Sequence, residues 1–104
     1  MDHYKIRITD QAINDMRSIY EYIAEDLCVP GIAIAQYNRI ADAIETLDQM
    51  PERIKIVDSE PERSRGLRKL IVDNYAVFYL IANESVIITN VLYGASDLEK
   101  RLRD

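Results

Sequence analysis

The chain has 104 residues, of which 48% are hydrophobic and 30% charged, with 3 glycines and 3 prolines. This length predicts a single domain over residues 1–104, and the composition excludes a disordered or collagen-like chain. Its one cysteine excludes an internal disulfide, and its net charge of -5 argues against a generic nucleic-acid-coating protein. No apolar stretch reaches the roughly 20 residues of a membrane span. We therefore expect a cytoplasmic protein that does not associate with membranes.

The N-terminal part predicts one strand and one helix. Residues 4–8 alternate apolar and basic side chains, which is the period-two pattern of a half-buried strand. Thr9 or Asp10 can then cap a helix over residues 10–27, whose apolar side chains recur at spacings of three and four.

A second helix is expected to start at Pro30 and to end before Pro51. Proline is well tolerated at the first helical position, and the residue before a proline disfavours helix. Because the connection between the two helices is short, they should pair as an antiparallel hairpin.

The C-terminal half predicts strands. Residues 51–65 are polar and without a clear period, so we expect a loop, with a short strand at 54–57. Two turns rich in Asp and Asn then separate three strands, at 67–72, 75–82 and 86–93, which should form an antiparallel meander. Residues 96–104 predict a short helix or a frayed tail.

The element order β-α-α-β-β-β indicates an α+β fold, in which an antiparallel sheet carries the N-terminal helical hairpin on one face. The other face should be free. Next to it lies segment 53–69, whose six basic and three acidic residues give +3 and leave -8 on the rest of the chain. Such an asymmetry indicates either a working face or a solvated loop.

Several short motifs, in this order, resemble the RelE/ParE superfamily of toxins, which includes plasmid stabilisation proteins. They are Tyr20-Glu21-Tyr22-Ile23-Ala24, Met50-Pro51-Glu52-Arg53, Arg63-Ser64-Arg65-Gly66-Leu67-Arg68, Val72-Asp73-Asn74-Tyr75-Ala76-Val77-Phe78-Tyr79 and Val91-Leu92-Tyr93-Gly94 with Asp97. The fold of that superfamily is the same strand, helical hairpin and antiparallel sheet.

The resemblance implies a toxin of a bacterial type II toxin–antitoxin system, neutralised by a cognate antitoxin, as a homodimer or a toxin–antitoxin hetero-oligomer. Its RelE branch contains ribosome-dependent endoribonucleases that cut mRNA without a metal or other cofactor. Its ParE branch poisons DNA gyrase without nuclease chemistry. The partner is therefore the ribosome with mRNA in one case and gyrase in the other.

Of the two branches we favour the ribonuclease, with the gyrase poison as the alternative, because the Arg68 and Tyr93 positions are both filled. The ribonuclease interpretation also assigns the catalytic residues. Metal-free cleavage needs a base for the ribose 2′-hydroxyl, cations at the phosphate and an acid for the leaving oxygen. Arg68 is the first candidate at the phosphate, because a guanidinium binds phosphate through two parallel hydrogen bonds. Tyr93 matches the position where ribonuclease members place an aromatic or histidine residue. Arg63, Arg65 and Lys69 would bind the substrate.

Other interpretations stay open. Superfamily members usually read Tyr-Gly-Gly-Arg-Asp after the last strand, whereas this chain has Ser96 in place of the arginine. A catalytically decayed member that only binds its antitoxin would fit that departure. The basic residues would equally fit a solvated strand edge paired with neighbouring carboxylates. In a regular strand, Arg65 and Lys69 would share one face and Arg68 the other.

Overall fold

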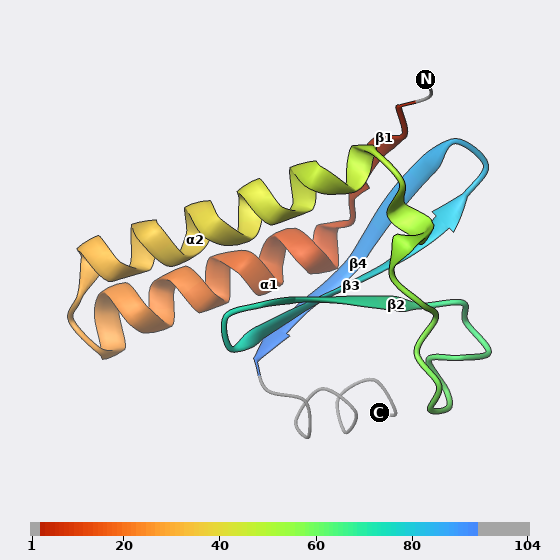
Figure 1. Cartoon of the computed structure of the whole chain (residues 1–104). Helices are drawn as coiled ribbons and strands as arrows, with labels where there is room; N and C mark the ends of the chain where they lie inside the picture. Colours follow the sequence, from red (N-terminus) through yellow and green to blue (C-terminus); the bar gives the residue numbers. More distant parts are fainter. Residues whose placement is uncertain (1–2, 94–104) are drawn as a thin grey trace.

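The computed structural model describes residues 3–93, so the segment expected at 96–104 and Ser96 lie outside the described residues. The helical elements are α1 (Asp10–Glu21), the π-helical turn η1 (Tyr22–Asp26), α2 (Pro30–Glu45) and the 3-10 turns η2 (Thr46–Asp48) and η3 (Pro51–Arg53). The strands are β1 (Lys5–Ile8), β2 (Arg68–Val72), β3 (Tyr75–Ala82) and β4 (Ser85–Tyr93). The α+β class and the element order are confirmed, with the helical hairpin lying along one side of the sheet (Figure 1).

Local signals in the sequence set the helix ends. The Thr9 hydroxyl accepts a hydrogen bond from the Ala12 N–H at 3.1 Å, which satisfies one of the unpaired amides of the first turn of α1. The first helix is helical to Asp26, one residue short of the predicted end, and its last five residues adopt the π form. Pro30 is the first residue of α2, as predicted. The helix ends at Glu45, several residues before Pro51, which was expected to stop it.

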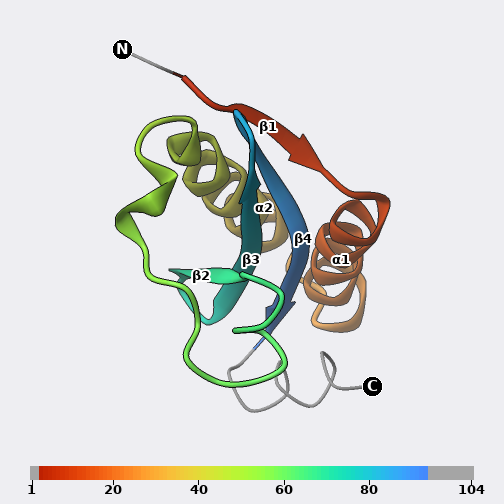
Figure 2. The same cartoon turned by 90° about the vertical axis from the view of Figure 1, so that its right-hand side faces the viewer.

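The sheet has the strand order β1-β4-β3-β2 and is mixed. The predicted meander of β2, β3 and β4 is confirmed. The prediction of a wholly antiparallel sheet is corrected at one edge, because β1 pairs in parallel with β4, from Lys5 opposite Ser85 to Ile8 opposite Ile88. Alternation in a sequence fixes the two faces of a strand but not its direction, and two helices separate β1 from the next strand. Figure 2 shows β1 and β2 at opposite edges of the sheet.

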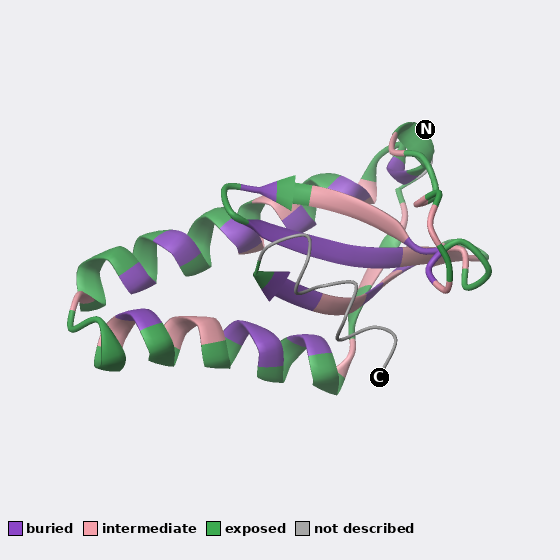
Figure 3. Cartoon of the chain, turned by 90° about the horizontal axis from the view of Figure 1, so that it is seen from below, coloured by how far each residue is buried: buried purple, intermediate pink, exposed green. Residues whose placement is uncertain are grey.

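The main core lies between the helical hairpin and one sheet face. Buried residues run without a break over the first five residues of β3, alternate in the first part of β4 and recur along both helices (Figure 3). From the helices they are Ala12, Met16, Ile40 and Ile44, and from the sheet Val77, Tyr79, Val86, Ile88 and Val91.

The opposite sheet face, which we will call the outer face, is not free as the sequence predicted. Ala76, Phe78 and Leu92 are buried there together with Leu67, which ends the long loop before β2. This loop folds back onto β2, because the Val57 N–H donates to the Leu67 carbonyl at 2.9 Å. The strand expected at 54–57 is reduced to a single bridge between Ile56 and Arg68.

Candidate functional site

Arg68, the predicted phosphate-binding residue, holds the loop that follows α2. It begins β2 opposite Tyr79, on the side of the sheet that faces the helices. Its guanidinium donates to the carbonyl oxygens of Ile54 and Glu52. Both hydrogen bonds come from the Nη1 nitrogen, so that nitrogen is not available to a phosphate.

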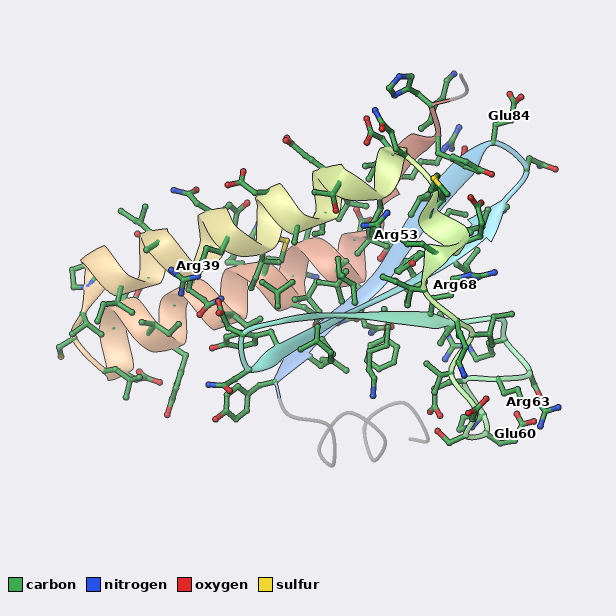
Figure 4. All side chains as sticks on the ribbon, viewed as in Figure 1. Arg39, Arg53, Glu60, Arg63, Arg68 and Glu84 are labelled. Atoms are coloured by element: carbon green, nitrogen blue, oxygen red, sulfur yellow. The ribbon has the colours of Figure 1, made fainter. Side chains whose placement is uncertain are left out.

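Arg53 has a similar role at the end of α2. Its guanidinium donates to the Gln49 carbonyl at 2.8 Å and to the Met50 carbonyl at 3.2 Å, and also reaches Thr46. Figure 4 shows Arg53 and Arg68 at the segment that follows α2. Two of the six cations of segment 53–69 are therefore bound to backbone carbonyls.

Tyr79 completes this anchoring of the loop. Its buried hydroxyl donates to the Pro51 carbonyl at 2.7 Å. Burial raises the pKa of Tyr79, and the nearby Arg68 and Arg53 guanidiniums oppose that rise. The hydroxyl therefore stays a hydrogen-bond donor at neutral pH.

The three predicted substrate-binding cations lie apart from Arg68. Arg63 and Arg65 are exposed in the turn before Gly66, and Lys69 stands on the outer face opposite Phe78. Arg65 is not in a strand, so the alternation expected from the sequence does not apply to it. The structure places Arg63, Arg65 and Lys69 around the outer side and Arg68 on the opposite face.

Tyr93, the second predicted catalytic residue, ends β4 near the β2–β3 turn, whereas Arg68 begins β2. Tyr93 lies opposite Tyr75, with the two rings edge-to-face at a centroid distance of 5.3 Å, and is 57% exposed. Arg68 lies opposite Tyr79, four residues further along β3, which is roughly 13 Å at about 3.3 Å per residue. The structure does not bring Arg68 and Tyr93 together.

Tyr93 instead lines a groove between the first helix and the end of β4. The groove has a volume of ≈ 1130 Å³ and a largely apolar wall. Tyr22, Leu27 and Ile32 line it although each is at least half exposed, and Tyr75 forms part of its wall. Burial, together with neighbouring Tyr93 and Tyr22, raises the pKa of Tyr75.

Asp15 supports one wall of this groove and was not among the residues predicted from the sequence. The carboxylate accepts from the Val91 N–H at 3.0 Å and from the Gln11 amide at 2.8 Å. Because β1 pairs only with residues 85–88, β4 has no strand partner at Val91 on that side, and Asp15 supplies the acceptor. A signal was present, since Asp15 falls on the buried stripe of α1 between Ala12 and Ile19.

A second carboxylate joins α2 to the β2–β3 turn. Asp73 accepts from the Arg39 Nε at 2.7 Å and from the Gln36 amide at 3.0 Å. These hydrogen bonds, Arg39 first, lower the pKa of Asp73. They fix the turn against the helical hairpin.

Within residues 3–93 no group of three or more His, Cys, Asp or Glu side chains is arranged to hold a metal ion. Across the same residues, no helix has the length and apolar character to cross a membrane. His3 pairs with Asp48 at 3.3 Å, near the start of β1.

Solved structures with a similar fold include two toxin–antitoxin systems. The chromosomal ParDE system of P. aeruginosa matches with a TM-score of 0.75 and 19% identity over 89% of this chain and 98% of that chain. The RelBE2 complex of Mycobacterium tuberculosis matches with a TM-score of 0.62 and 23% identity over 89% and 93%. The conserved hypothetical protein HP0894 of Helicobacter pylori matches with a TM-score of 0.52 and 12% identity over 86% and 93%.

A search of curated proteins found no match. A family model described as the ParE toxin of the type II toxin–antitoxin system parDE matches residues 6–98. That range covers the helical hairpin and all but the first residue of the sheet. The resemblance to the RelE/ParE superfamily is therefore confirmed, and the chain belongs to the family of ParE toxins of type II toxin–antitoxin systems.

Proposed function

We propose that this toxin poisons DNA gyrase without cutting nucleic acid, in the bacterial cytoplasm, and that a cognate antitoxin neutralises it. The observation that carries the choice is the position of Arg68. Its guanidinium is bound to the carbonyls of Glu52 and Ile54, far from Tyr93. The match to the ParE family model favours the same branch.

Ribonuclease chemistry needs several groups around one phosphate. A base and cations must converge within hydrogen-bond reach of the reacting atoms. Arg68 and Tyr93 are separated by roughly 13 Å along the sheet, the exposed Arg63 and Arg65 lie in the loop before β2, and the half-buried Lys69 stands on the other sheet face. Inhibition by binding requires no such convergence.

The antitoxin would occupy the groove beside Tyr93. Both toxin–antitoxin neighbours are described as systems of two partners, and this chain has the same fold. The groove offers exposed Tyr22, Leu27, Ile32 and Tyr93 side chains, and burial of such apolar area stabilises protein complexes.

The test is controlled expression of the full chain in a bacterial host, following growth, plasmid supercoiling and mRNA ends in one culture. We expect growth arrest, altered supercoiling and intact mRNA. New mRNA ends detected by primer extension, with unchanged supercoiling, would contradict gyrase poisoning and would support the ribonuclease function. Normal growth with soluble, folded protein would favour a member that only binds its antitoxin.

Purified protein makes the same test independent of the cell. The wild-type toxin should inhibit supercoiling of relaxed plasmid by gyrase in a concentration-dependent way. Incubation of the toxin with translating ribosomes and mRNA is the parallel control, in which we expect no cleavage. Cleavage there without gyrase inhibition contradicts the proposal.

A further inference from the structure

The helical layer of the molecule is strongly acidic, whereas residues 3–9 and 49–93, which hold the sheet, contain eight basic and six acidic residues, a net charge of +2. Residues 10–48, which hold the helical hairpin, contain eight acidic and two basic residues, a net charge of -6. The outer face of the sheet, on the other side, is bordered by cations along both edges. The views in Figures 1 and 2 place the hairpin on one side of the sheet only.

At the β2 edge two lysines stand directly opposite one another. The Ile56–Arg68 bridge and the Val57–Leu67 hydrogen bond set a register that places Lys55 opposite Lys69. Val57 and Leu67 pack on the outer face, so strand alternation places both lysines there as well. Like charges directly opposite are destabilising, and neither lysine makes an ion pair within the described part of the chain.

At the β1 edge a second row of cations points the same way. Lys5 lies opposite Ser85 and Arg7 opposite Ile87. Ile87 in turn lies opposite Leu80, which packs on the outer face, so Lys5 and Arg7 also stand on that face. Both are exposed, and neither forms an ion pair among residues 3–93.

The loop before β2 adds cations to the first row. Arg63 and Arg65 are exposed there, and Figure 4 shows Arg63 and Glu60 in this loop. Glu62 is only 1% exposed, and Glu60 accepts from the Ser64 N–H at 3.0 Å. The exposed charge of the loop is therefore balanced, with Arg63 and Arg65 beside the exposed Asp58 and Glu60, and the excess of positive charge lies in the lysine pair.

We propose that the outer face is a docking surface for the phosphate backbone of DNA, specifically the DNA held in the gyrase complex. This inference rests on the proposed function. Lys69 in β2 and the cations of β1 are three strand spacings apart, about 14 Å, which is close to the roughly 12 Å width of the major groove, and Lys55 lies one strand spacing further out. Each row can therefore meet one phosphate strand, while the acidic hairpin faces away from the DNA.

Salt dependence tests this surface directly. Removing one phosphate-binding cation should reduce the slope of log affinity against log salt by about 1. We compare the wild type with the double variant Lys55→Gln/Lys69→Gln and the control Arg17→Gln, an exposed cation of α1. Removing the lysine pair also relieves a like-charge repulsion, so the double variant should be at least as stable as wild type, and weaker binding by it is not a failure to fold.

The first measurement is the affinity for a short DNA duplex, followed by fluorescence anisotropy at about 50 to 200 mM salt. Over this range, a protein with several phosphate contacts changes its affinity for DNA by about 10³-fold or more. The double variant should have a slope lower by about 2, while Arg17→Gln keeps the slope of wild type. An unchanged slope in the double variant overturns the inference, as does tighter binding to an RNA duplex of the same sequence.

The second measurement is inhibition of gyrase by the same proteins. Half-maximal inhibition should require an about tenfold higher concentration of the double variant than of wild type or Arg17→Gln. The loss of two phosphate-binding side chains is expected to weaken binding by at least this factor. Equal inhibition by the double variant overturns the inference and leaves the proposed function standing. Failure of wild type to inhibit gyrase, with salt-dependent DNA binding intact, rejects the proposed function instead.

Discussion

The carboxylate of Asp15 accepts a hydrogen bond from the backbone N–H of Val91 at 3.0 Å, although 76 positions separate the two residues. Asp15 thereby takes the place of a strand partner along β4 beyond the end of β1. One side chain of a helix thus completes the hydrogen bonding of a sheet and shapes a wall of the groove.

Replacing Asp15 should reveal this role as a loss of stability. Asp15→Ala leaves the buried Val91 N–H without a partner, which should cost about 1–3 kcal/mol in the free energy of unfolding. Asp15→Asn retains an acceptor oxygen and should lose less. Urea denaturation measures both variants, and an equal loss in both would show that the acceptor is not what matters.

Arg68→Ala should destabilise the fold before it affects any chemistry. The loop at residues 52–54 would lose the donors that bind its carbonyls, at about 1–3 kcal/mol. Arg63→Ala, an exposed control from the same basic segment, should change stability by less than about 0.5 kcal/mol. Chemical denaturation compares the two. A wild-type midpoint for Arg68→Ala, combined with lost toxicity, would contradict the anchoring role.

Asp73 should make stability sensitive to acid. Its hydrogen bonds from Arg39 and Gln36 lower its pKa below the ordinary 3.8. The unfolded chain therefore binds this proton first as the pH falls, so the stabilisation is present above pH 3.8 and is lost as the pH drops through the folded-state pKa.

Asp73→Asn is a suitable variant, because asparagine tolerates the positive φ of 57° found there. The melting temperature of wild type should exceed that of Asp73→Asn at neutral pH. The gap should close in acid, as followed by circular dichroism. A gap that is constant with pH would exclude the ionised carboxylate as its cause.

Tyr79 should make stability sensitive to base. Its raised pKa means that the folded protein keeps the phenol proton above pH 10.0, where the unfolded chain releases it. Stability is therefore present below pH 10.0 and is lost as the pH rises through the folded-state pKa.

The variant Tyr79→Phe tests the hydrogen bond and the ionisation of the Tyr79 phenol at two different pH values. The variant lacks the hydrogen bond to the Pro51 carbonyl, so its free energy of unfolding at neutral pH should fall by about 1–2 kcal/mol. Above the ordinary tyrosine pKa, its stability should also decrease less steeply with pH than that of wild type. Tyr75→Phe is the matched control at neutral pH, since it removes a hydroxyl from the same strand. Denaturation midpoints at neutral pH and above pH 10.0 give both comparisons, and parallel alkaline curves for wild type and Tyr79→Phe would refute the assignment.

Much of the fold could be predicted from local patterns. The Thr9 cap, the start of the second helix at Pro30 and the strands on either side of Asp73-Asn74 all follow from short-range preferences that the structure obeys. The parallel pairing of β1 could not be predicted, because it depends on where the chain returns after two helices.

The site residues were harder to predict for a similar reason. Arg68 binds carbonyls on a loop that carries no periodic signal, so its partners are visible only once the loop has folded back. The lysine pair on the outer face depends on the same loop, through a single bridge at Ile56. The basic segment could be found by counting charges in the sequence. Which of its cations bind backbone carbonyls, and which remain able to bind a partner, depends on the tertiary structure.

The pairing of β1 with β4 has a consequence for how the toxin comes into being. Lys5 and Ser85 are 80 positions apart. The edge strand β1 is synthesised first, but it can pair only after β4 has been synthesised. Pairings this distant in sequence are formed late, after the entropy of closing the long intervening chain has been lost. A nascent or truncated chain that stops before Ser85 therefore lacks the closed sheet. During synthesis, β1 therefore stays without its sheet partner until nearly the whole described sequence has emerged.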